Sequence, residues 1–255
     1  MNRGPMKYSI VIPTYNNCDK FLKPCIEALL KYSHLNDIEL IISANGCTDN
    51  TSEYLNKLKT SFDYLGLSDH LKVVWNTDAL GYARATNAGI RVSTCDKLVM
   101  LNNDAILLGQ HRGDWLRLLN SAFEDNPKCG ISCSLKKHSP ITNMDFGVFF
   151  CVMFPREVLN KVGYLDERYE KGGNEDIDFC AAAQLLGYEV VQPVPLVWSN
   201  EANLYVGTFP LWHQGEGTVH NPELVSDWEQ TFRINELKLA QKYNMAWYEA
   251  HKHTV

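Results

Sequence analysis

Three carboxylates stand close together in the stretch Gly173-Asn174-Glu175-Asp176-Ile177-Asp178. Asn174 is a residue type that favours the cap of a helix, which we expect over residues 175–186. Acidic residues in a first turn complement the helix dipole, which contributes only about 0.3–1 kcal/mol for each group. Three acids in four positions are more than this purpose requires. Their mutual repulsion tends to raise a pKa, and a carboxylate held near a hydroxyl group can act as a general base.

A second polar group, Asn102-Asn103-Asp104, directly follows an apolar segment at 97–101. An aspartate there offers the oxygen ligand that a hard divalent cation prefers, and such a cation could bridge to a phosphorylated ligand. His213 follows another apolar segment and precedes a glycine-rich turn. With Asp104 as co-ligand it could complete a metal site. The plainer interpretations are an ordinary turn for the Asn/Asp cluster and a structural role for the histidine.

The first half of the chain alternates apolar strands with amphipathic helices. Strands that are apolar throughout and separated by single helices indicate a parallel sheet covered on both faces. We expect strands at 8–12, 39–43, 71–75 and 97–101, and helices at 19–32, 48–58 and 82–92. Ligands of such sheets bind beyond the carboxyl ends of the strands. The segments to inspect are therefore 13–17, 44–49, 76–81 and 102–104.

After Asp104 the pattern is less regular, and we expect one compact unit with two lobes. The final helix carries a stripe that is more typical of core than of an interface, made of Leu224, Trp228, Phe232, Asn235 and Leu239. His251 and His253 are expected in a solvated tail. The remaining expected elements are strands at 130–135, 146–154, 189–198 and 204–212, helices at 115–123, 156–162, 175–186 and 222–243, and a polar loop at 136–143.

The composition excludes some classes of protein. The chain has 255 residues and a net charge of -6, which argues against a nucleic-acid backbone as the main partner. Eight cysteines without a CxxC pair favour buried free thiols in a reducing compartment. The N-terminal residues lack an apolar signal region, and the longest apolar run, 146–154, is too short for a membrane span. These features predict a cytoplasmic protein, in solution or at the periphery of a membrane, with no integral membrane segment.

Several motifs, in order, resemble the family-2 glycosyltransferases of the GT-A fold, particularly the rhamnosyltransferase-like members. The segments at 9–16 and 45–51 resemble that family's opening strand and its N-G-S-T-D-G-T turn, and those at 80–83 and 87–90 resemble its G-F-A…N-x-G-I helix start. Leu101-Asn102-Asn103-Asp104 stands where its D-x-D-type metal motif falls. The segments 163–167 and 175–178 resemble G-x-F-D-E…E-D-x-D, and 212–215 resembles its late histidine loop.

The resemblance implies a single GT-A domain over 1–255. Its sheet would be Rossmann-like, mainly parallel and flanked by helices, with a smaller mixed acceptor lobe. Residues 7–104 would form the nucleotide-sugar-binding half, 105–220 the acceptor and catalytic half, and 221–245 a C-terminal helix. The reaction implied is the inverting transfer of a sugar from a UDP-, dTDP- or GDP-sugar to a hydroxyl of a carbohydrate or glycan acceptor.

The resemblance also assigns residues to roles. Asp104, with His213 as second ligand, would bind Mn²⁺ or Mg²⁺ bridging the diphosphate. Asp176 would be the base, Glu175 the close alternative, and Asp178 would orient a neighbour. The nucleotide would be bound by residues of the loops after the first strands, namely Pro13, Thr14, Tyr15, Asn45, Arg84, Asn102 and Asn103.

Three departures from the family pattern leave alternatives open. Ala44 stands where many relatives have Asp, which leaves Asn45 as the reader of the base. Thr86 and Ala182 stand where relatives often have Arg, so Arg84 is the substitute considered for the first. These losses motivate an alternative, a catalytically silent nucleotide-sugar-binding module on the same fold. A sugar-1-phosphate nucleotidyltransferase is disfavoured, because no Gly-rich loop bearing Arg and Lys lies near the first strand.

Overall fold

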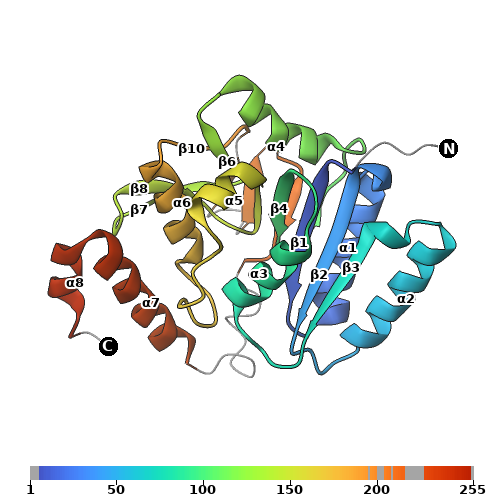
Figure 1. Cartoon of the computed structure of the whole chain (residues 1–255), viewed down its shortest axis with the longest axis horizontal. Coiled ribbons are helices and arrows are strands. Elements are labelled where there is room, and N and C mark those ends of the chain that lie inside the picture. The colour runs from blue at the N-terminus through green and yellow to red at the C-terminus, as the bar shows by residue number, and fades with distance from the viewer. Residues whose placement is uncertain (1–5, 195, 200–203, 208, 216–226, 254–255) are drawn as a thin grey trace.

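The computed structural model describes residues 6–194, 196–199, 204–207, 209–215 and 227–253. A seven-stranded sheet with the order β10-β6-β9-β4-β1-β2-β3 forms its centre (Figure 1). The strands are β1 (Tyr8–Thr14), β2 (Ile38–Asn45), β3 (Leu71–Asn76), β4 (Lys97–Leu101), β6 (Cys129–Cys133), β9 (Cys151–Pro155) and β10 (Glu189–Val191). The predicted α/β fold with a mainly parallel sheet is confirmed.

One strand, β9, reverses the direction of the sheet. It is antiparallel to β4 and to β6, whereas β1–β2, β1–β4, β2–β3 and β6–β10 are parallel pairs. Pro155, the last residue of β9, pairs with Lys97, the first residue of β4. The end of β9 therefore lies at the edge of the sheet opposite to the carboxyl ends of β1, β2 and β4.

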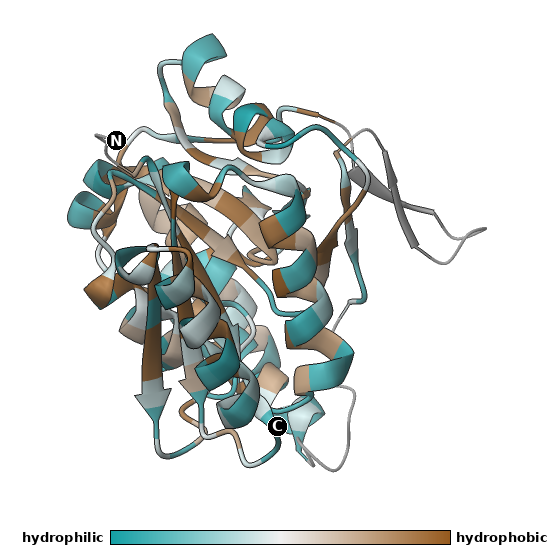
Figure 2. Ribbon diagram, turned by 90° about the vertical axis from the view of Figure 1, so that its right-hand side faces the viewer, coloured by the Kyte–Doolittle hydropathy of each residue, from teal (hydrophilic) through white to brown (hydrophobic). Residues whose placement is uncertain are grey.

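Helices cover both faces of the sheet, as the apolar strands predict. In β1, Ile10 and Ile12 pack into one hydrophobic cluster and Val11 into the other. The first cluster includes side chains of α1 (Lys23–Tyr32), α2 (Thr51–Tyr64) and α4 (Asp114–Asp125), and the second those of α3 (Tyr82–Val92), α5 (Arg156–Val162) and α6 (Glu175–Leu185). Figure 2 shows that the central strands are mostly hydrophobic, whereas the helices around them carry both hydrophilic and hydrophobic residues.

The predicted polar loop at 136–143 is wrong in part, because its first residues belong to a hairpin. β7 (Lys136–Ser139) pairs antiparallel with β8 (Met144–Gly147). Lys136 and His138 both contact the carboxylate of Asp145, each at 3.0 Å. These side chains are exposed, so β7 lacks the alternation of apolar residues that would have marked it as a strand.

Three predicted strands, 146–154, 189–198 and 204–212, are each divided in two. Residues 148–150 separate β8 from β9, and β10 ends at Val191 before β11 (Leu196–Ser199) begins. β12 (Leu204–Gly207) pairs with β11, whereas β13 (Leu211–His213) pairs with β5 (Ala105–Leu107). The first break is invisible in the sequence because residues 148–150, Val-Phe-Phe, are as apolar as the strands beside them.

The C-terminal part holds two helices instead of the single one predicted. α7 is described over Trp228–Tyr243, and the predicted start at residues 222–226 lies outside the described residues. Asn244 caps a further helix, α8 (Met245–His251), by accepting a hydrogen bond from Trp247 N. The expected solvated tail is wrong for His251, which is half-buried and stacks on Trp247. Figure 1 shows α7 and α8 beside α6.

The stripe of α7 is only partly core. Asn235 and Leu239 are fully buried, Trp228 is half-buried, and Phe232 is 37% exposed. Leu224 lies outside the described residues.

Smaller features complete the fold. A π-helical turn (Cys18–Leu22) precedes α1, and short 3₁₀ turns (Leu35–Asp37 and Ser68–His70) precede β2 and β3. α2 begins at Thr51 rather than at residue 48, because Asp49 binds both Thr51 N and Cys18 N and holds residues 46–50 in a turn. All eight cysteines are free thiols, and all but Cys47 are buried. Within the described residues, no helix is long and apolar enough to cross a membrane.

Candidate active site

Asp104 and His213, predicted as partners from distant parts of the sequence, are in contact. Asp104 lies between β4 and β5, and His213 ends β13, whose antiparallel pairing with β5 sets His213 opposite Ala105. The His213 Nε2 atom is 3.1 Å from Asp104 Oδ1, and both side chains are less than 10% exposed. The imidazole stacks on the ring of Phe150, with 4.1 Å between the centroids and 11° between the planes. Packing against Phe150 therefore fixes the orientation of the imidazole, and the imidazole contacts the Asp104 carboxylate.

The geometry of this pair fits a divalent cation. Two neighbouring ligands of an octahedral ion with bonds of about 2.1 Å lie about 3 Å apart, which is close to the separation of the two donor atoms. Carboxylate oxygen with imidazole nitrogen suits Mn²⁺ and, less strongly, Mg²⁺. Among the described residues, no cluster of three or more His, Cys, Asp or Glu side chains is arranged to hold a metal. An ion here would thus need oxygens from substrate or water.

Glu175 and Asp176 begin α6, as predicted. Glu175 is buried and Asp176 half-buried, with Asp176 Oδ1 accepting a 2.8 Å hydrogen bond from Ile177 N. Burial raises the pKa of both carboxyl groups, and the charge of Asp176 raises the pKa of Glu175 further. Carboxylates with raised pKa values hold a proton more strongly than surface ones, which is the property required of a general base working near neutral pH.

The segment Phe149-Phe150, where the predicted long strand breaks, connects these two pairs. The backbone amide of Phe149 lies close enough to the Asp176 carboxylate to lower its pKa, and the Phe149 carbonyl accepts a 3.0 Å hydrogen bond from the hydroxyl of Tyr82. The next residue, Phe150, stacks on His213, and its carbonyl accepts a 2.9 Å hydrogen bond from Asn102 N. The break in the strand therefore places the acidic helix start and the Asp104–His213 pair around one backbone segment.

Tyr82, the first residue of α3, is a site residue that sequence reasoning missed. Burial raises the pKa of its phenol, and the negative charges of Glu175, Asp176 and Asp104 raise it further. All three carboxylates therefore lie within electrostatic range of one hydroxyl group. The position of Tyr82 directly after the loop at 76–81 was the signal that could have identified it.

Asn174 does not cap α6, which corrects the expectation from its residue type. Its backbone is left-handed (φ 75°), and its side chain makes no capping bond. The side chain is 3% exposed, and neither its Nδ2 nor the neighbouring Glu175 Oε2 has a hydrogen-bond partner among the described residues. An unpaired buried polar group costs about 1–3 kcal/mol. The two residues at the start of the acidic helix thus each carry one buried polar atom, an amide donor and a carboxylate acceptor, without a partner among the described residues.

Asp178 lies apart from the other two acids and anchors the C-terminal helix. Its Oδ1 accepts a 2.7 Å hydrogen bond from Tyr243 and lies 2.7 Å from Lys242 Nζ. Asn235 adds two 3.0 Å hydrogen bonds, to the carbonyls of Glu170 and Gly172. α7 thereby holds both α6 and the loop that leads into it.

The predicted nucleotide-binding residues fall along the carboxyl edge of the sheet, with one difference. Asn103 Nδ2 donates to Thr14 Oγ1 at 2.9 Å, so the loops after β1 and β4 are joined. Asn45 Oδ1 accepts from Leu80 N at 2.8 Å, which joins the loops after β2 and β3. Pro13 and Tyr15 flank Thr14 at the end of β1. By contrast, the half-exposed Arg84 has its Nε 3.9 Å from a carboxylate oxygen of Glu167.

Comparison with known proteins identifies the family of this arrangement. A family model described as glycosyl transferase family 2 matches residues 9–146, which is more than half of the chain. Asp104 lies within the match, and the acidic helix start and His213 lie beyond it. The chain is also 31% identical over 107 residues to a hyaluronan synthase of Pasteurella multocida. That alignment spans 42% of this chain but only 10% of the synthase.

Solved structures share the fold at low sequence identity. A mannosyltransferase from Pyrobaculum calidifontis, in complex with GDP-Man and Mn²⁺, superposes with a TM-score of 0.60 and 17% identity over 75% of this chain and 57% of its own. GalNAc-T7 with UDP, GalNAc and Mn²⁺ gives 0.59 and 12% identity over 72% and 42%. The chain thus has the α/β fold of the GT-A glycosyltransferases, and it spans about half the length of these two structures.

Proposed function

The chain belongs to glycosyl transferase family 2, and on that premise we propose that it transfers a sugar from a nucleotide diphosphate-sugar to a hydroxyl group of a carbohydrate acceptor. The observation that carries the proposal is the arrangement around Phe149-Phe150. It sets a buried Asp–His pair, suited to a metal–diphosphate complex, near a carboxylate pair with raised pKa values. In this arrangement the Asp–His pair is assigned to stabilise the charge of the leaving group, and the carboxylate pair is assigned to remove the proton.

In the proposed reaction, Asp104 and His213 would hold Mn²⁺ or Mg²⁺, and the bound ion would stabilise the negative charge that grows on the departing diphosphate. Asp176 takes the proton from the acceptor hydroxyl, whose oxygen attacks the anomeric carbon on the face opposite to the diphosphate. The new glycosidic bond forms as the bond to the phosphate oxygen breaks, and the configuration inverts. Glu175 is the alternative base.

The binding roles follow from position. In this proposal the base and the ribose are contacted by Pro13, Thr14, Tyr15, Asn102 and Asn103. Asn45 distinguishes one base from another. Arg84, paired with Glu167, contacts the donor only after exchanging that partner. We assign the unpaired amide of Asn174 to a sugar hydroxyl, because such a hydroxyl can accept from Asn174 Nδ2 and donate to Glu175 Oε2.

The donor follows from the resemblance and the relatives. The solved structures hold GDP-Man in one case and UDP with GalNAc in the other. We propose a UDP-, dTDP- or GDP-linked hexose or deoxyhexose, in keeping with the resemblance to rhamnosyltransferase-like members.

The experiment is an assay of nucleoside diphosphate release. The purified chain is incubated with UDP-, dTDP- and GDP-sugars and Mn²⁺, with and without simple sugar acceptors. The proposal expects slow release from one donor alone and faster release with an acceptor. Metal-dependent binding without any release, under all of these conditions, would instead identify a catalytically silent nucleotide-sugar-binding module.

A further inference from the structure

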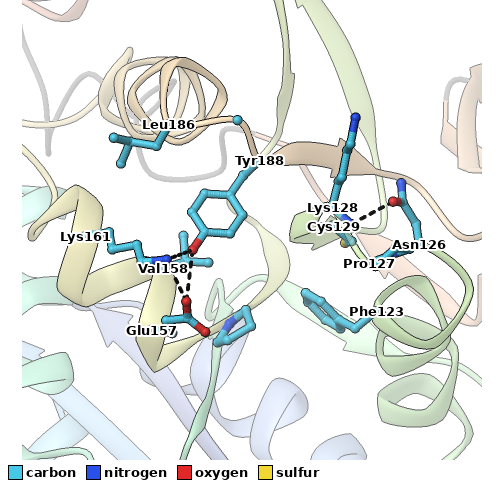
Figure 3. Close-up of a pocket in the computed structure, with 12 residues that line it drawn as sticks. Phe123, Asn126, Pro127, Lys128, Cys129, Glu157, Val158, Lys161, Leu186 and Tyr188 are labelled. Carbon is cyan, nitrogen blue, oxygen red and sulfur yellow. Dashed lines mark hydrogen bonds and ion pairs between the residues drawn. The ribbon is translucent and has the colours of Figure 1, made fainter.

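A cavity lies at the end of the sheet opposite to the candidate active site (Figure 3). It is bordered by Cys129, the first residue of β6, and by Pro155, the last residue of the reversed strand β9. Asp104 follows the carboxyl end of β4, so the length of β4 separates the two places. A ligand in this cavity would therefore not share the contacts of the nucleotide-sugar. Its volume of about 480 Å³ is within the range of small-ligand sites.

One wall of the cavity is a tyrosine ring with a fixed orientation. Behind Tyr188, β6 approaches so closely that a Cβ on Gly130 would lie 2.6 Å from the Tyr188 Cβ. At its other end, the Tyr188 hydroxyl accepts a 2.9 Å hydrogen bond from Lys161 Nζ, which also lies 2.7 Å from Glu157 Oε1 (Figure 3). Because the ring is held before any ligand arrives, little conformational entropy is lost on binding.

The opposite wall also presents a preset polar group. The Asn126 amide donates to Glu189 Oε2 and accepts from Lys128 N, each at 2.9 Å. Phe123 lies beside it, with the ammonium group of Lys97 5.0 Å from its ring centroid. Leu186, 54% exposed, forms part of the rim. The cavity thus combines two aromatic rings with an amide, a hydroxyl, a carboxylate and the ammonium groups of Lys161 and Lys128.

This combination selects among classes of ligand. The carboxylate of Glu157 would repel a phosphate. A purely apolar molecule is also disfavoured, because it would remove the polar groups of the cavity from water without offering them hydrogen bonds. The Lys161–Glu157 pair neutralises itself, and the side chain of Lys128 extends away from Tyr188 and Glu157 (Figure 3), so the ligand needs no charge. A sugar ring matches the remaining features, because its C–H face fits an aromatic ring and its hydroxyls both donate and accept hydrogen bonds. We propose that this cavity, defined by Tyr188, Lys161, Glu157 and Asn126, is a second, non-catalytic site that binds a neutral carbohydrate.

The test measures binding directly and does not depend on the proposed enzymatic activity. Saturation-transfer NMR is recorded on the whole chain with maltose, cellobiose, lactose and diacetylchitobiose at millimolar concentration. We expect at least one disaccharide to receive saturation from the wild type and from the Asp104→Asn variant, and none from Tyr188→Ala. Tyr64→Ala is the matched control, since Tyr64 on α2 is 92% exposed.

A second variant covers the case in which Tyr188→Ala fails to fold. Lys161 is half-exposed, and Lys161→Ala leaves the aromatic wall in place while removing one hydrogen-bond donor. We expect the dissociation constant, followed through the amide shifts of Gly187 and Lys128, to rise about two- to tenfold. The proposal is overturned if no disaccharide binds, if binding is unchanged in both cavity variants, or if binding is lost in Asp104→Asn, which would place the sugar at the candidate active site.

Discussion

The hydroxyl of Tyr82 donates a 3.0 Å hydrogen bond to the carbonyl of Phe149. This bond ties the start of α3 to the backbone segment that contacts both Asp176 and, through Phe150, His213. The substitution Tyr82→Phe removes the hydroxyl and leaves that carbonyl without its donor. We expect it to lower the free energy of unfolding by about 0.5–1.5 kcal/mol. We also expect a lower transfer rate, because the backbone segment that contacts both Asp176 and His213 loses one of its hydrogen bonds. Denaturant unfolding and a transfer assay measure both. An unchanged transfer rate would show that the bond is only structural.

Asp176→Asn separates binding from chemistry. The amide cannot accept the acceptor's proton, so we expect the transfer rate to fall about 10²–10⁴-fold. Binding of the nucleotide-sugar should persist, since the metal pair is untouched. Titration calorimetry and product analysis follow the two properties, with Asp125→Asn, at an exposed aspartate that ends α4, as the control. Transfer at the native rate would exclude Asp176, and a comparable loss only in Glu175→Gln would reassign the base.

Glu175→Gln makes a prediction about stability and pH. Burial, and then the charge of Asp176, raises the pKa of Glu175 in the folded chain above its unfolded value of about 4.3. Between these two pKa values the folded state binds more protons than the unfolded state, so the free energy of unfolding falls as the pH rises. Above this window the variant should be more stable than the wild type by at least about 1 kcal/mol, the equivalent of roughly one pKa unit.

The difference in the free energy of unfolding between Glu175→Gln and the wild type should decrease as the pH falls. At about pH 3 and below, the Glu175 carboxyl is neutral in both states, and the two unfolding curves should nearly coincide. Denaturant titrations across this pH range measure the difference. A difference that does not vary with pH would mean that Glu175 is not the buried ionising group described.

Asn174→Gly distinguishes a substrate contact from a structural residue. Glycine adopts the left-handed backbone of this position freely, and the substitution also removes an unpaired buried amide. We expect a melting temperature equal to or above that of the wild type, together with a fall in kcat/KM of about two- to tenfold. Measuring donor hydrolysis without an acceptor, and then transfer with one, shows which sugar Asn174 contacts. A loss of stability with unchanged kcat/KM would assign Asn174 to the fold alone.

Sequence reasoning was most successful where one physical effect dominates. The apolar runs at 8–12 and 97–101 form buried central strands, because few alternatives exist for such segments in water. Asp104 and His213 were paired in the prediction because both residue types can bind a metal and because both lie in motifs that resemble the family. The hairpin at β7 was missed because its polar side chains are stabilised by pairing with β8 rather than by local propensity.

The parts of the site that sequence reasoning missed depend on tertiary structure. Asn174 is a residue type that often caps a helix through its side chain, but here it makes no such bond. Its backbone is left-handed and follows two glycines that also have positive φ. The break at Phe149-Phe150 lies within an unbroken apolar run, so no residue type marks it. Both features become visible only when α6, α3 and β9 are packed together.

Metal-dependent binding of a nucleoside diphosphate tests the central claim most directly. Thermal unfolding is measured with UDP, dTDP and GDP, each with and without Mn²⁺, because a ligand that binds only the folded state raises the melting temperature. The account predicts that one diphosphate raises it only when Mn²⁺ is present, and that Asp104→Asn and His213→Gln both lose this rise. An equal rise without Mn²⁺, or a metal-dependent rise retained in both variants, would contradict the assignment of Asp104 and His213.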